Sequence, residues 1–199
     1  MPKRYTPNDN WSRKAAAEGY RARSVYKLME LDERFTLLHP GMMVLDLGAA
    51  PGSWLQYASK AVGRQGKVIG VDLQAIDEVA PNVSVHRFDI TNDAKIETML
   101  EEEEVGYVDL VLSDIAPSTS GVKDVDQWRS VELAHAVLAV ATRHLKKDGF
   151  CVIKVFRGGD FDELLRDIKT AGHWRDVRAT KVQASRDRSR EVYLVMKKR

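Results

Sequence analysis

One lysine stands inside an otherwise apolar run of this sequence. Lys154 belongs to Phe150–Phe156, which reads FCVIKVF. An ammonium group in a buried strand is costly unless it is paired, and burial favours the neutral amine, which can accept a proton from a hydroxyl group. A lysine at the solvent end of a strand would instead extend its charge into water, but this one lies in the middle of the run. The pattern predicts a buried lysine that acts as a general base.

A second chemically informative segment is Val44–Trp54, which reads VLDLGAAPGSW. Its apolar run ends at Asp46 and breaks into Gly48 and Gly52, the pattern of a buried strand, a tight turn near a ligand and the start of a helix. In an open α/β sheet, ligands bind at the carboxyl ends of such strands. The turn lacks both the Gly-Lys-Ser/Thr of a P-loop and the third glycine of the dinucleotide fingerprint. A nucleoside without a pyrophosphate fits this difference, and S-adenosylmethionine is the candidate.

Two further aspartates follow predicted strands. Asp72 ends the second strand, 24 residues after Gly48, where a carboxylate can accept hydrogen bonds from both hydroxyls of a ribose. A capping or turn role is the alternative for this residue. Asp89 follows the third strand and could bind an adenine amino group, although aspartates are common in such turns. Together with the glycine turn, these acids predict a nucleoside site.

The loop after the fourth predicted strand bears on the methyl acceptor. Asp114 lies in the segment SDIAP, where methyltransferases that act on exocyclic amines often carry Pro-Pro and an aromatic residue. Here Ile115 and Ala116 replace the prolines and Pro117 replaces the aromatic, which disfavours methylation of a base nitrogen. Methylation at C5 of a pyrimidine needs a cysteine nucleophile, and Cys151 lies in a predicted buried strand. A hydroxyl acceptor remains.

The elements that must position these residues alternate along the chain. Helices are predicted from Ser24 as N-cap, after Gly52, from about 92, over 126–146 and over 161–170. Strands are predicted near 42–47, 67–72, 83–88, 107–113, 150–156, 174–183 and 191–197. This order predicts a mostly parallel sheet covered on both faces, and the last two strands predict an antiparallel hairpin at one edge. We expect one domain over residues 1–199, with residues 1–20 as a loosely ordered basic arm.

Composition sets broad limits on location and ligands. The chain has 199 residues, of which 44% are hydrophobic and 30% are charged, as in ordinary globular proteins. The sequence shows no apolar run of the roughly 20 residues that span a bilayer and no apolar segment typical of a secretory signal. The single cysteine suggests a reducing compartment, and the five histidines show no metal-ligand spacing. We therefore expect a cytoplasmic monomer without a metal site.

Charge is distributed unevenly along the sequence. Residues 1–27 carry a net charge of +5 and residues 175–199 carry +6, whereas the stretch between them carries −9. Two basic ends around an acidic middle suggest a surface that binds a polyanion. Basic tails that only aid solubility would show the same counts. Charge alone does not separate these two interpretations.

Five segments, in this order, resemble the motifs of the FtsJ (RrmJ) family of S-adenosylmethionine-dependent ribose 2′-O-methyltransferases. They are Tyr20–Leu28, Asp46–Trp54, Ser113–Pro117, Val152–Phe156 and Ser189–Tyr193. The resemblance covers nearly the whole chain. It implies a Rossmann-like class I methyltransferase fold, a seven-stranded and mostly parallel sheet with one antiparallel strand and helices on both faces. Two departures are a serine at position 53, where glycine is common, and a short N-terminal arm.

The resemblance also implies roles for individual residues. The catalytic tetrad of the family falls on Lys27, Asp114, Lys154 and Glu191, of which the first and last would otherwise be interpreted as solvated charges. Its cofactor contacts fall on Gly52, Trp54, Asp72, Asp89 and Asp114, to which the turn itself adds Gly48. In this hypothesis Lys154 is the base, Lys27 disfavours its protonation by like-charge repulsion, and the two acids orient the lysines and the hydroxyl. Rate also comes from holding hydroxyl and methyl in near-attack geometry.

RNA is the partner that the resemblance implies, most specifically a uridine of large-subunit (23S) ribosomal RNA. Seven arginines are candidates for phosphate contacts: Arg4, Arg13, Arg21, Arg23, Arg186, Arg188 and Arg190. Three alternatives remain. A tRNA anticodon-loop ribose methyltransferase would show the same motifs, a non-catalytic RNA-binding assembly factor could retain the fold, and a small-molecule O-methyltransferase would not need the basic ends.

Overall fold

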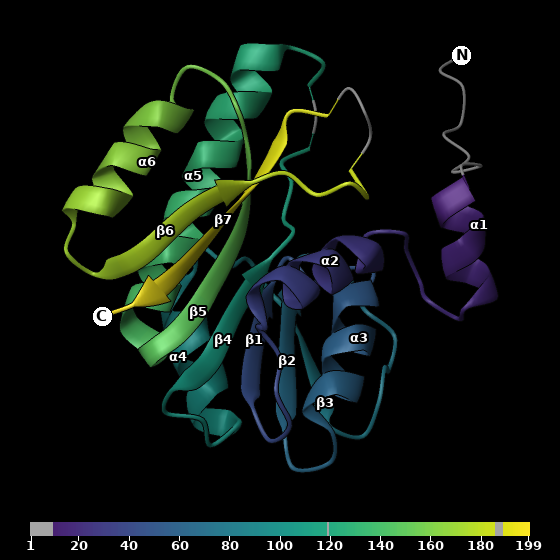
Figure 1. Ribbon diagram of the computed structural model, residues 1–199. Helices are drawn as coiled ribbons and strands as arrows, with labels where there is room; N and C mark the ends of the chain where they lie inside the picture. The colour runs from purple at the N-terminus through teal and green to yellow at the C-terminus, as the bar shows by residue number, and fades with distance from the viewer. Residues whose placement is uncertain (1–9, 119, 186–188) are drawn as a thin grey trace.

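The computed structural model describes residues 10–118, 120–185 and 189–199. Its seven strands form one sheet in the order β3-β2-β1-β4-β5-β7-β6 (Figure 1). Their bounds are Met43–Leu47 (β1), Lys67–Asp72 (β2), Val83–Arg87 (β3), Val108–Ser113 (β4), Leu145–Phe156 (β5), Trp174–Thr180 (β6) and Glu191–Lys198 (β7). Neighbours among β1 to β5 pair in parallel, and β7 is antiparallel to both β5 and β6. The predicted mostly parallel sheet with one reversed strand and an edge hairpin is confirmed.

Six helices accompany the sheet in the described part of the chain. They are Asn10–Ala17 (α1), Val25–Phe35 (α2), Ser53–Val62 (α3), Asp93–Glu102 (α4), Lys123–His144 (α5) and Phe161–Thr170 (α6). Residues of α2 and α3 pack in one core on one face of the sheet, and residues of α4, α5 and α6 pack in a second core on the other face. Both faces are therefore covered, as the alternation of strands and helices predicts.

Alternate residues of the central strands serve the two cores. In β1, Leu45 and Leu47 pack with α4–α6, whereas Val44 packs with α2 and α3. This period of two follows from strand geometry, in which successive side chains point to opposite faces. Strands buried on both faces need near-continuous apolar sequence, which makes a charged residue inside β5 conspicuous.

The structure differs from the sequence-based expectations at the N-terminal end. Residues 10–17 form helix α1, where a loosely ordered arm was expected, because Ala15 is buried against Val25 and Tyr26 of α2 and Ala184 of the loop before β7. Ser24 precedes α2, but its side chain does not cap that helix. Its hydroxyl instead lies 2.8 Å from the Ser53 hydroxyl and so links α2 to α3.

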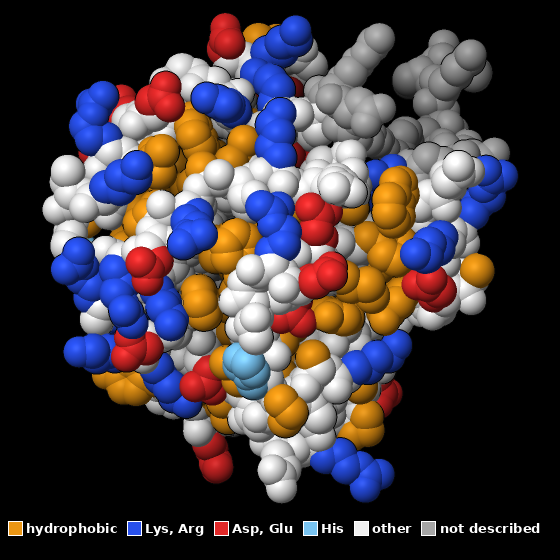
Figure 2. All heavy atoms as spheres, viewed as in Figure 1, with side chains coloured by type: hydrophobic (Ala, Val, Ile, Leu, Met, Phe, Trp, Pro, Cys, Tyr) orange, Lys and Arg blue, Asp and Glu red, His pale blue; other side chains and the backbone are white. Residues whose placement is uncertain are grey.

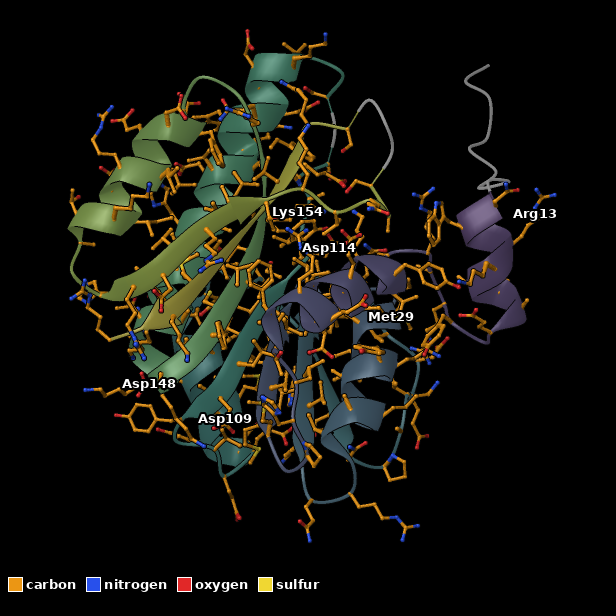
Figure 3. The ribbon with its side chains drawn as sticks, viewed as in Figure 1. Arg13, Met29, Asp109, Asp114, Asp148 and Lys154 are labelled. Carbon is orange, nitrogen blue, oxygen red and sulfur yellow. The ribbon has the colours of Figure 1, made fainter. Side chains whose placement is uncertain are left out.

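The strand ends gather chemically active side chains at one edge. Figure 3 shows Asp114 and Lys154 close together near the carboxyl ends of β4 and β5, with Asp109 and Asp148 far from them toward the opposite edge.

In the described part of the chain, no helix is both long and apolar enough to cross a membrane.

Candidate active site

Four charged side chains from four different elements meet at the carboxyl edge of the sheet. Lys27 comes from α2, Asp114 directly follows β4, Lys154 lies near the end of β5, and Glu191 begins β7. The antiparallel register of β5 and β7 places Lys154 opposite Tyr193 and Phe156 opposite Glu191. The reversed strand is therefore what brings Glu191 to the edge where β4 and β5 end.

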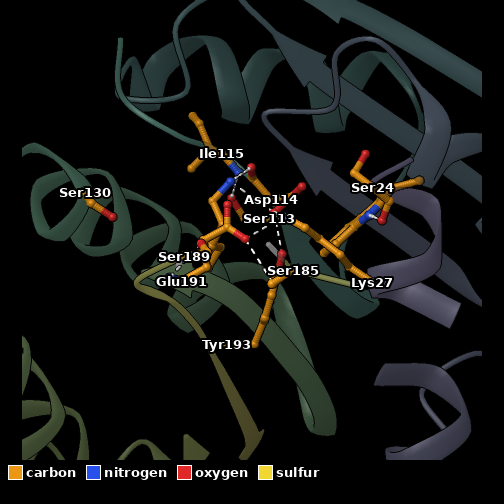
Figure 4. Close-up of polar contacts among 12 residues, drawn as sticks. Ser24, Lys27, Ser113, Asp114, Ile115, Ser130, Ser185, Ser189, Glu191 and Tyr193 are labelled. Atoms are coloured by element: carbon orange, nitrogen blue, oxygen red, sulfur yellow. Dashed lines mark hydrogen bonds and ion pairs between the residues drawn. The ribbon is translucent and has the colours of Figure 1, made fainter. Parts of the chain in front are cut away.

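The four charges form a chain of alternating sign, of which Figure 4 labels Lys27, Asp114 and Glu191. Lys27 Nζ lies 2.8 Å from Glu191 Oε2 and 3.6 Å from Asp114 Oδ1. Asp114 Oδ1 lies 3.0 Å from Lys154 Nζ, which also donates a hydrogen bond to the Asp114 backbone carbonyl. The order Glu191–Lys27–Asp114–Lys154 gives each buried charge an opposite neighbour, which offsets the cost of removing these groups from water.

Lys154 is buried as the apolar run predicts. Its side chain is 5% exposed and its ammonium contacts Asp114 rather than bulk water. Lys27 is also buried, with a side chain 10% exposed, although its place beside an apolar stripe suggested an ordinary surface lysine. The structure thus brings together all four residues of the predicted tetrad.

The Asp114 carboxyl is held in its charged form. Burial alone would raise its pKa, but the positive charges of Lys154 and Lys27 outweigh burial and leave the pKa below its ordinary value. The phenol of Tyr193 adds to this effect because it donates a 2.6 Å hydrogen bond to Asp114 Oδ1. A charged carboxylate that contacts both lysines can orient their amines.

Two residues of this network were not predicted from the sequence. Tyr193 is fully buried, its ring lies 5.8 Å from Lys27 Nζ, and burial together with the charges of Asp114 and Glu191 raises its pKa. Ser185 donates a 3.1 Å hydrogen bond to Glu191 Oε2. The position of Tyr193 two residues after Glu191 was a usable signal, since residues i and i+2 of a strand share a face.

A small hollow beside the tetrad carries an unsatisfied acid. Asp46 is 1% exposed and neither of its carboxylate oxygens has a hydrogen-bond partner among the described residues. Burial, with further contributions from Asp114 and Asp72, raises its pKa well above the ordinary value. The hollow is lined by Ser24, Asp46, Gly48, Ala49, Ala50, Ser53, Trp54 and Asp114. A buried acid without a partner fits a site for a cationic or hydrogen-bond-donating ligand.

The two turn glycines are required for different reasons. Both have positive φ, +85° at Gly48 and +101° at Gly52. A Cβ at Gly48 would lie 2.5 Å from Ile115 Cβ, so this glycine lets the turn approach the residue that follows Asp114. A Cβ at Gly52 would lie 2.8 Å from Arg21 Nη1, so this glycine makes room for a guanidinium group.

The remaining predicted cofactor residues are Asp72, Trp54 and Asp89, of which Trp54 lines the hollow. Asp72 accepts a 2.9 Å hydrogen bond from the backbone N–H of Ala50 and a 2.8 Å bond from that of Gln74. Trp54 is buried and its indole donates to the Ser24 carbonyl, which joins the cofactor turn to α2. Asp89 is exposed, and its Oδ1 accepts hydrogen bonds from the backbone N–H and the hydroxyl of Thr91. No side-chain hydrogen bond or ion pair joins Asp89 to another predicted cofactor residue in the described part of the chain.

The arginines expected to bind phosphate differ in their contacts within the protein. Arg21 and Arg23 donate to backbone carbonyls, Arg21 to Pro51, Asp77 and Glu78, and Arg23 to Ala184. Arg190 donates to the Lys123 carbonyl at the start of α5, and Arg13 lies exposed on α1. Arg4, Arg186 and Arg188 lie outside the described residues. Arg21 and Arg23 thus hold segments together rather than extending freely into solvent.

Two competing chemistries are disfavoured by the geometry. Cys151 is fully buried inside β5, and burial raises the pKa of its thiol, so it cannot serve as a loop nucleophile. Pro117 follows Asp114 by three residues and offers no aromatic face on which a base could stack. A hydroxyl group therefore remains the expected methyl acceptor.

Comparison with known proteins identifies close relatives. Residues 20–199 match the FtsJ-like methyltransferase family. The ribosomal RNA large subunit methyltransferase E of Bdellovibrio bacteriovorus is 44% identical over 194 residues, which cover 96% of both chains. The protein of the same name from Azoarcus sp. (strain BH72) is 47% identical over 188 residues, which cover 94% of this chain and 90% of the relative.

Solved structures resemble the fold as well. A crystal structure from Plasmodium falciparum, assigned as a ribosomal RNA methyltransferase, is 30% identical with a TM-score of 0.78 and covers 90% of this chain and 98% of its own. The fibrillarin/Nop5p complex contains a chain with a TM-score of 0.62 at 21% identity, which covers 87% of this chain and 81% of its own and shows a shared fold alone.

Proposed function

This chain belongs to the FtsJ-like methyltransferase family, and on that premise we propose that it transfers a methyl group from S-adenosylmethionine to a ribose 2′-hydroxyl of large-subunit ribosomal RNA. The observation that carries the proposal is the alternating chain of Glu191, Lys27, Asp114 and Lys154 beside the hollow that contains Asp46. Two amines and two carboxylates in contact suit proton transfer from a weakly acidic hydroxyl.

The residues around the hollow fit the cofactor. When bound, S-adenosylmethionine supplies a methyl group on a positively charged sulfonium. The unpartnered carboxylate of Asp46 suits a cationic ligand, and Gly48 keeps the adjacent turn free of a side chain. Asp72 is held between two backbone N–H groups at the end of β2, where a ribose would be bound. We assign Gly48, Gly52, Trp54, Asp72, Asp89 and Asp114 to this site and add Asp46.

Lys154 is the proposed base. In its neutral form the amine accepts the proton of the 2′-hydroxyl, and Lys27 lies on the far side of Asp114. Asp114 orients both lysines, and Glu191 holds Lys27 through the 2.8 Å contact.

Ribosomal RNA is favoured as the substrate because of the relatives. The two proteins that cover nearly the whole chain at 44% and 47% identity are both named as large-subunit ribosomal RNA methyltransferases. We propose a uridine of that RNA as the acceptor nucleotide.

A substrate panel tests the proposal. The protein and S-adenosylmethionine labelled on the methyl group are incubated separately with large ribosomal subunits, free ribosomal RNA and tRNA, and the modified ribose is then mapped. We expect label on a ribose 2′-oxygen of large-subunit RNA. Label on tRNA alone, or on a base, would contradict the proposed function, and no label with any RNA would favour a non-catalytic RNA-binding protein.

A further inference from the structure

Arg21 connects the cofactor turn to the loop that follows β2. Its side chain donates hydrogen bonds to the backbone carbonyls of Pro51 (3.2 Å), Asp77 (2.9 Å) and Glu78 (2.6 Å). Pro51 belongs to the turn between β1 and α3, and the other two residues belong to the loop 73–82 between β2 and β3. One guanidinium group therefore links the turn at the end of β1 to the loop that follows β2.

Hydrogen bonds to α3 hold the backbone of Arg21 in place. The backbone N–H of Arg21 donates to Gln56 Oε1 of α3 at 2.9 Å, and Gln56 Nε2 donates to the Gly19 carbonyl at 3.0 Å. The linker between α1 and α2 thus lies along α3 (Figure 1). Gly52 completes the arrangement, because a Cβ there would lie 2.8 Å from Arg21 Nη1. The glycine of the turn makes room for the guanidinium group.

Asp72 bridges the same two segments at a second point. Its carboxylate accepts hydrogen bonds from Ala50 of the turn and from Gln74 of the loop. The turn and the loop therefore both contact the Asp72 carboxylate, and Arg21 links the same two segments. A planar guanidinium with five donors is suited to several carbonyls at once, whereas a lysine ammonium is not.

From these contacts we propose that Arg21 is a positioning residue for cofactor binding: it holds the loop 73–82 against the β1–α3 turn so that Asp72 is preorganised for the cofactor ribose. The inference rests on the proposed function, since it takes the Asp72 site to bind S-adenosylmethionine. It assigns to Arg21 a role within the protein rather than the phosphate contact expected from the sequence.

Arg34 provides a matched control. It is also a half-exposed arginine whose guanidinium joins separate elements, with hydrogen bonds to the Lys181 carbonyl (2.9 Å) and Thr180 Oγ1 (2.6 Å). It connects α2 to the end of β6 and touches neither the cofactor turn nor the loop 73–82. Loss of Arg34 should cost stability of a similar kind without changing the cofactor site.

The experiment measures cofactor binding in the absence of RNA. Equilibrium dissociation constants for S-adenosylmethionine and S-adenosylhomocysteine are compared for wild type, Arg21→Ala, Arg21→Lys and Arg34→Ala, alongside urea unfolding of each. Arg21→Ala should bind both compounds about tenfold more weakly, as expected for one lost charged hydrogen bond. Arg21→Lys should be intermediate and Arg34→Ala should bind as wild type does.

Hydrogen exchange gives a readout that does not depend on the cofactor. Backbone amides of the loop 73–82 should exchange faster in Arg21→Ala than in wild type and Arg34→Ala. The proposal is overturned if Arg21→Ala binds the cofactor as wild type does, or if Arg34→Ala weakens binding equally. Failure of the wild-type protein to bind S-adenosylmethionine would instead contradict the proposed function, so the two failures are distinguishable.

Discussion

Asp46 of β1 and Asp114, which follows the neighbouring strand β4, have surroundings that move their carboxyl pKa values in opposite directions. Asp114 contacts two lysines and a tyrosine, which hold its pKa below the ordinary value despite burial. Asp46 has no partner among the described residues, so burial raises its pKa. Asp114 therefore stabilises the folded protein in its charged form, whereas a charged Asp46 destabilises it.

Replacement of Asp46 by asparagine should stabilise the cofactor-free protein, and increasingly so as pH rises. Folding of the wild type takes up a proton between the ordinary pKa of an aspartate and the raised folded value, so its stability falls as pH rises through that window. Asp46→Asn takes up no such proton. A tenfold change in the ionisation equilibrium of one carboxyl corresponds to about 1.36 kcal/mol, so the variant should gain at least about 1 kcal/mol in urea unfolding at pH 8, and less at pH 5.

The same variant should bind S-adenosylmethionine more weakly, because the amide is neutral where the carboxylate would face a cationic ligand. Stability gained together with binding lost is the pattern of a residue kept for function. A gain that is equal at pH 5 and pH 8 would contradict the raised pKa of Asp46. Unchanged cofactor binding would remove Asp46 from the proposed site.

Among the site residues, those that interrupt a local sequence pattern are the easiest to predict from the sequence. Lys154 was recognisable because a charge interrupts an apolar run, and Lys27 and Glu191 were recognisable only through the family resemblance. Neither Tyr193 nor Arg21 breaks a local pattern, since a tyrosine suits a strand and an arginine suits a basic segment, and only the spacing of Tyr193 from Glu191 pointed to the site. Their roles depend on partners 79 residues away for Tyr193 and 30 to 57 residues away for Arg21.

The turn between β1 and α3 connects the proposed cofactor site to the loop that follows β4. Gly48 has φ +85° and lies so close to Ile115 that a Cβ would be 2.5 Å from its side chain. The turn therefore packs against the loop that begins at Asp114. Any residue larger than glycine must move either the turn or that loop.

Substitution of Gly48 by alanine should cost more stability than its backbone conformation alone explains. Gly41 is the matched control, because its φ is +83° and nothing lies within 4 Å of its hypothetical Cβ. Gly41→Ala should show only the strain of positive φ, about 1 kcal/mol. Gly48→Ala should lose more in urea unfolding and should also lose methyl transfer. Equal costs for the two variants would show that the close approach to Ile115 is not important.

The elements themselves were largely predictable from periodicity. All seven strands and the five predicted helices are found near their expected positions. Helix α1 was missed because its sequence is polar apart from three alanines and Trp11, and its helical state depends on the burial of Ala15 against α2 and the residue Ala184 far along the chain. Local sequence carries no information on such a contact.

On the scale of the whole molecule, the two basic ends of the chain meet. Ala15 and Tyr26 from the first basic segment pack with Ala184 from the last one, and Arg23 donates to the Ala184 carbonyl. Figure 2 shows Lys and Arg side chains spread over the face that carries β6 and β7, with Asp and Glu among them. The contact supports the expectation that both ends contribute to one RNA-binding surface.

RNA binding should therefore depend strongly on salt. If this surface neutralises several phosphates, the affinity for ribosomal RNA should fall by at least about tenfold between roughly 50 and 200 mM salt. Binding of S-adenosylmethionine alone should change much less over the same range, because it involves few released counterions. A weak salt dependence of RNA binding would favour the small-molecule methyltransferase alternative.

Lys154 is the residue proposed to accept the proton of the ribose hydroxyl, and single-turnover methyl transfer to ribosomal RNA measures this step. Lys146 lies on the same strand, exposed and paired with Asp109 at the opposite edge of the sheet, so Lys146→Ala is the matched control. Lys154→Ala should transfer methyl about 10²- to 10⁴-fold more slowly while it binds S-adenosylmethionine as wild type does, and Lys146→Ala should keep the wild-type rate. Transfer by Lys154→Ala at the wild-type rate, with cofactor binding unchanged, would show that Lys154 is not the base.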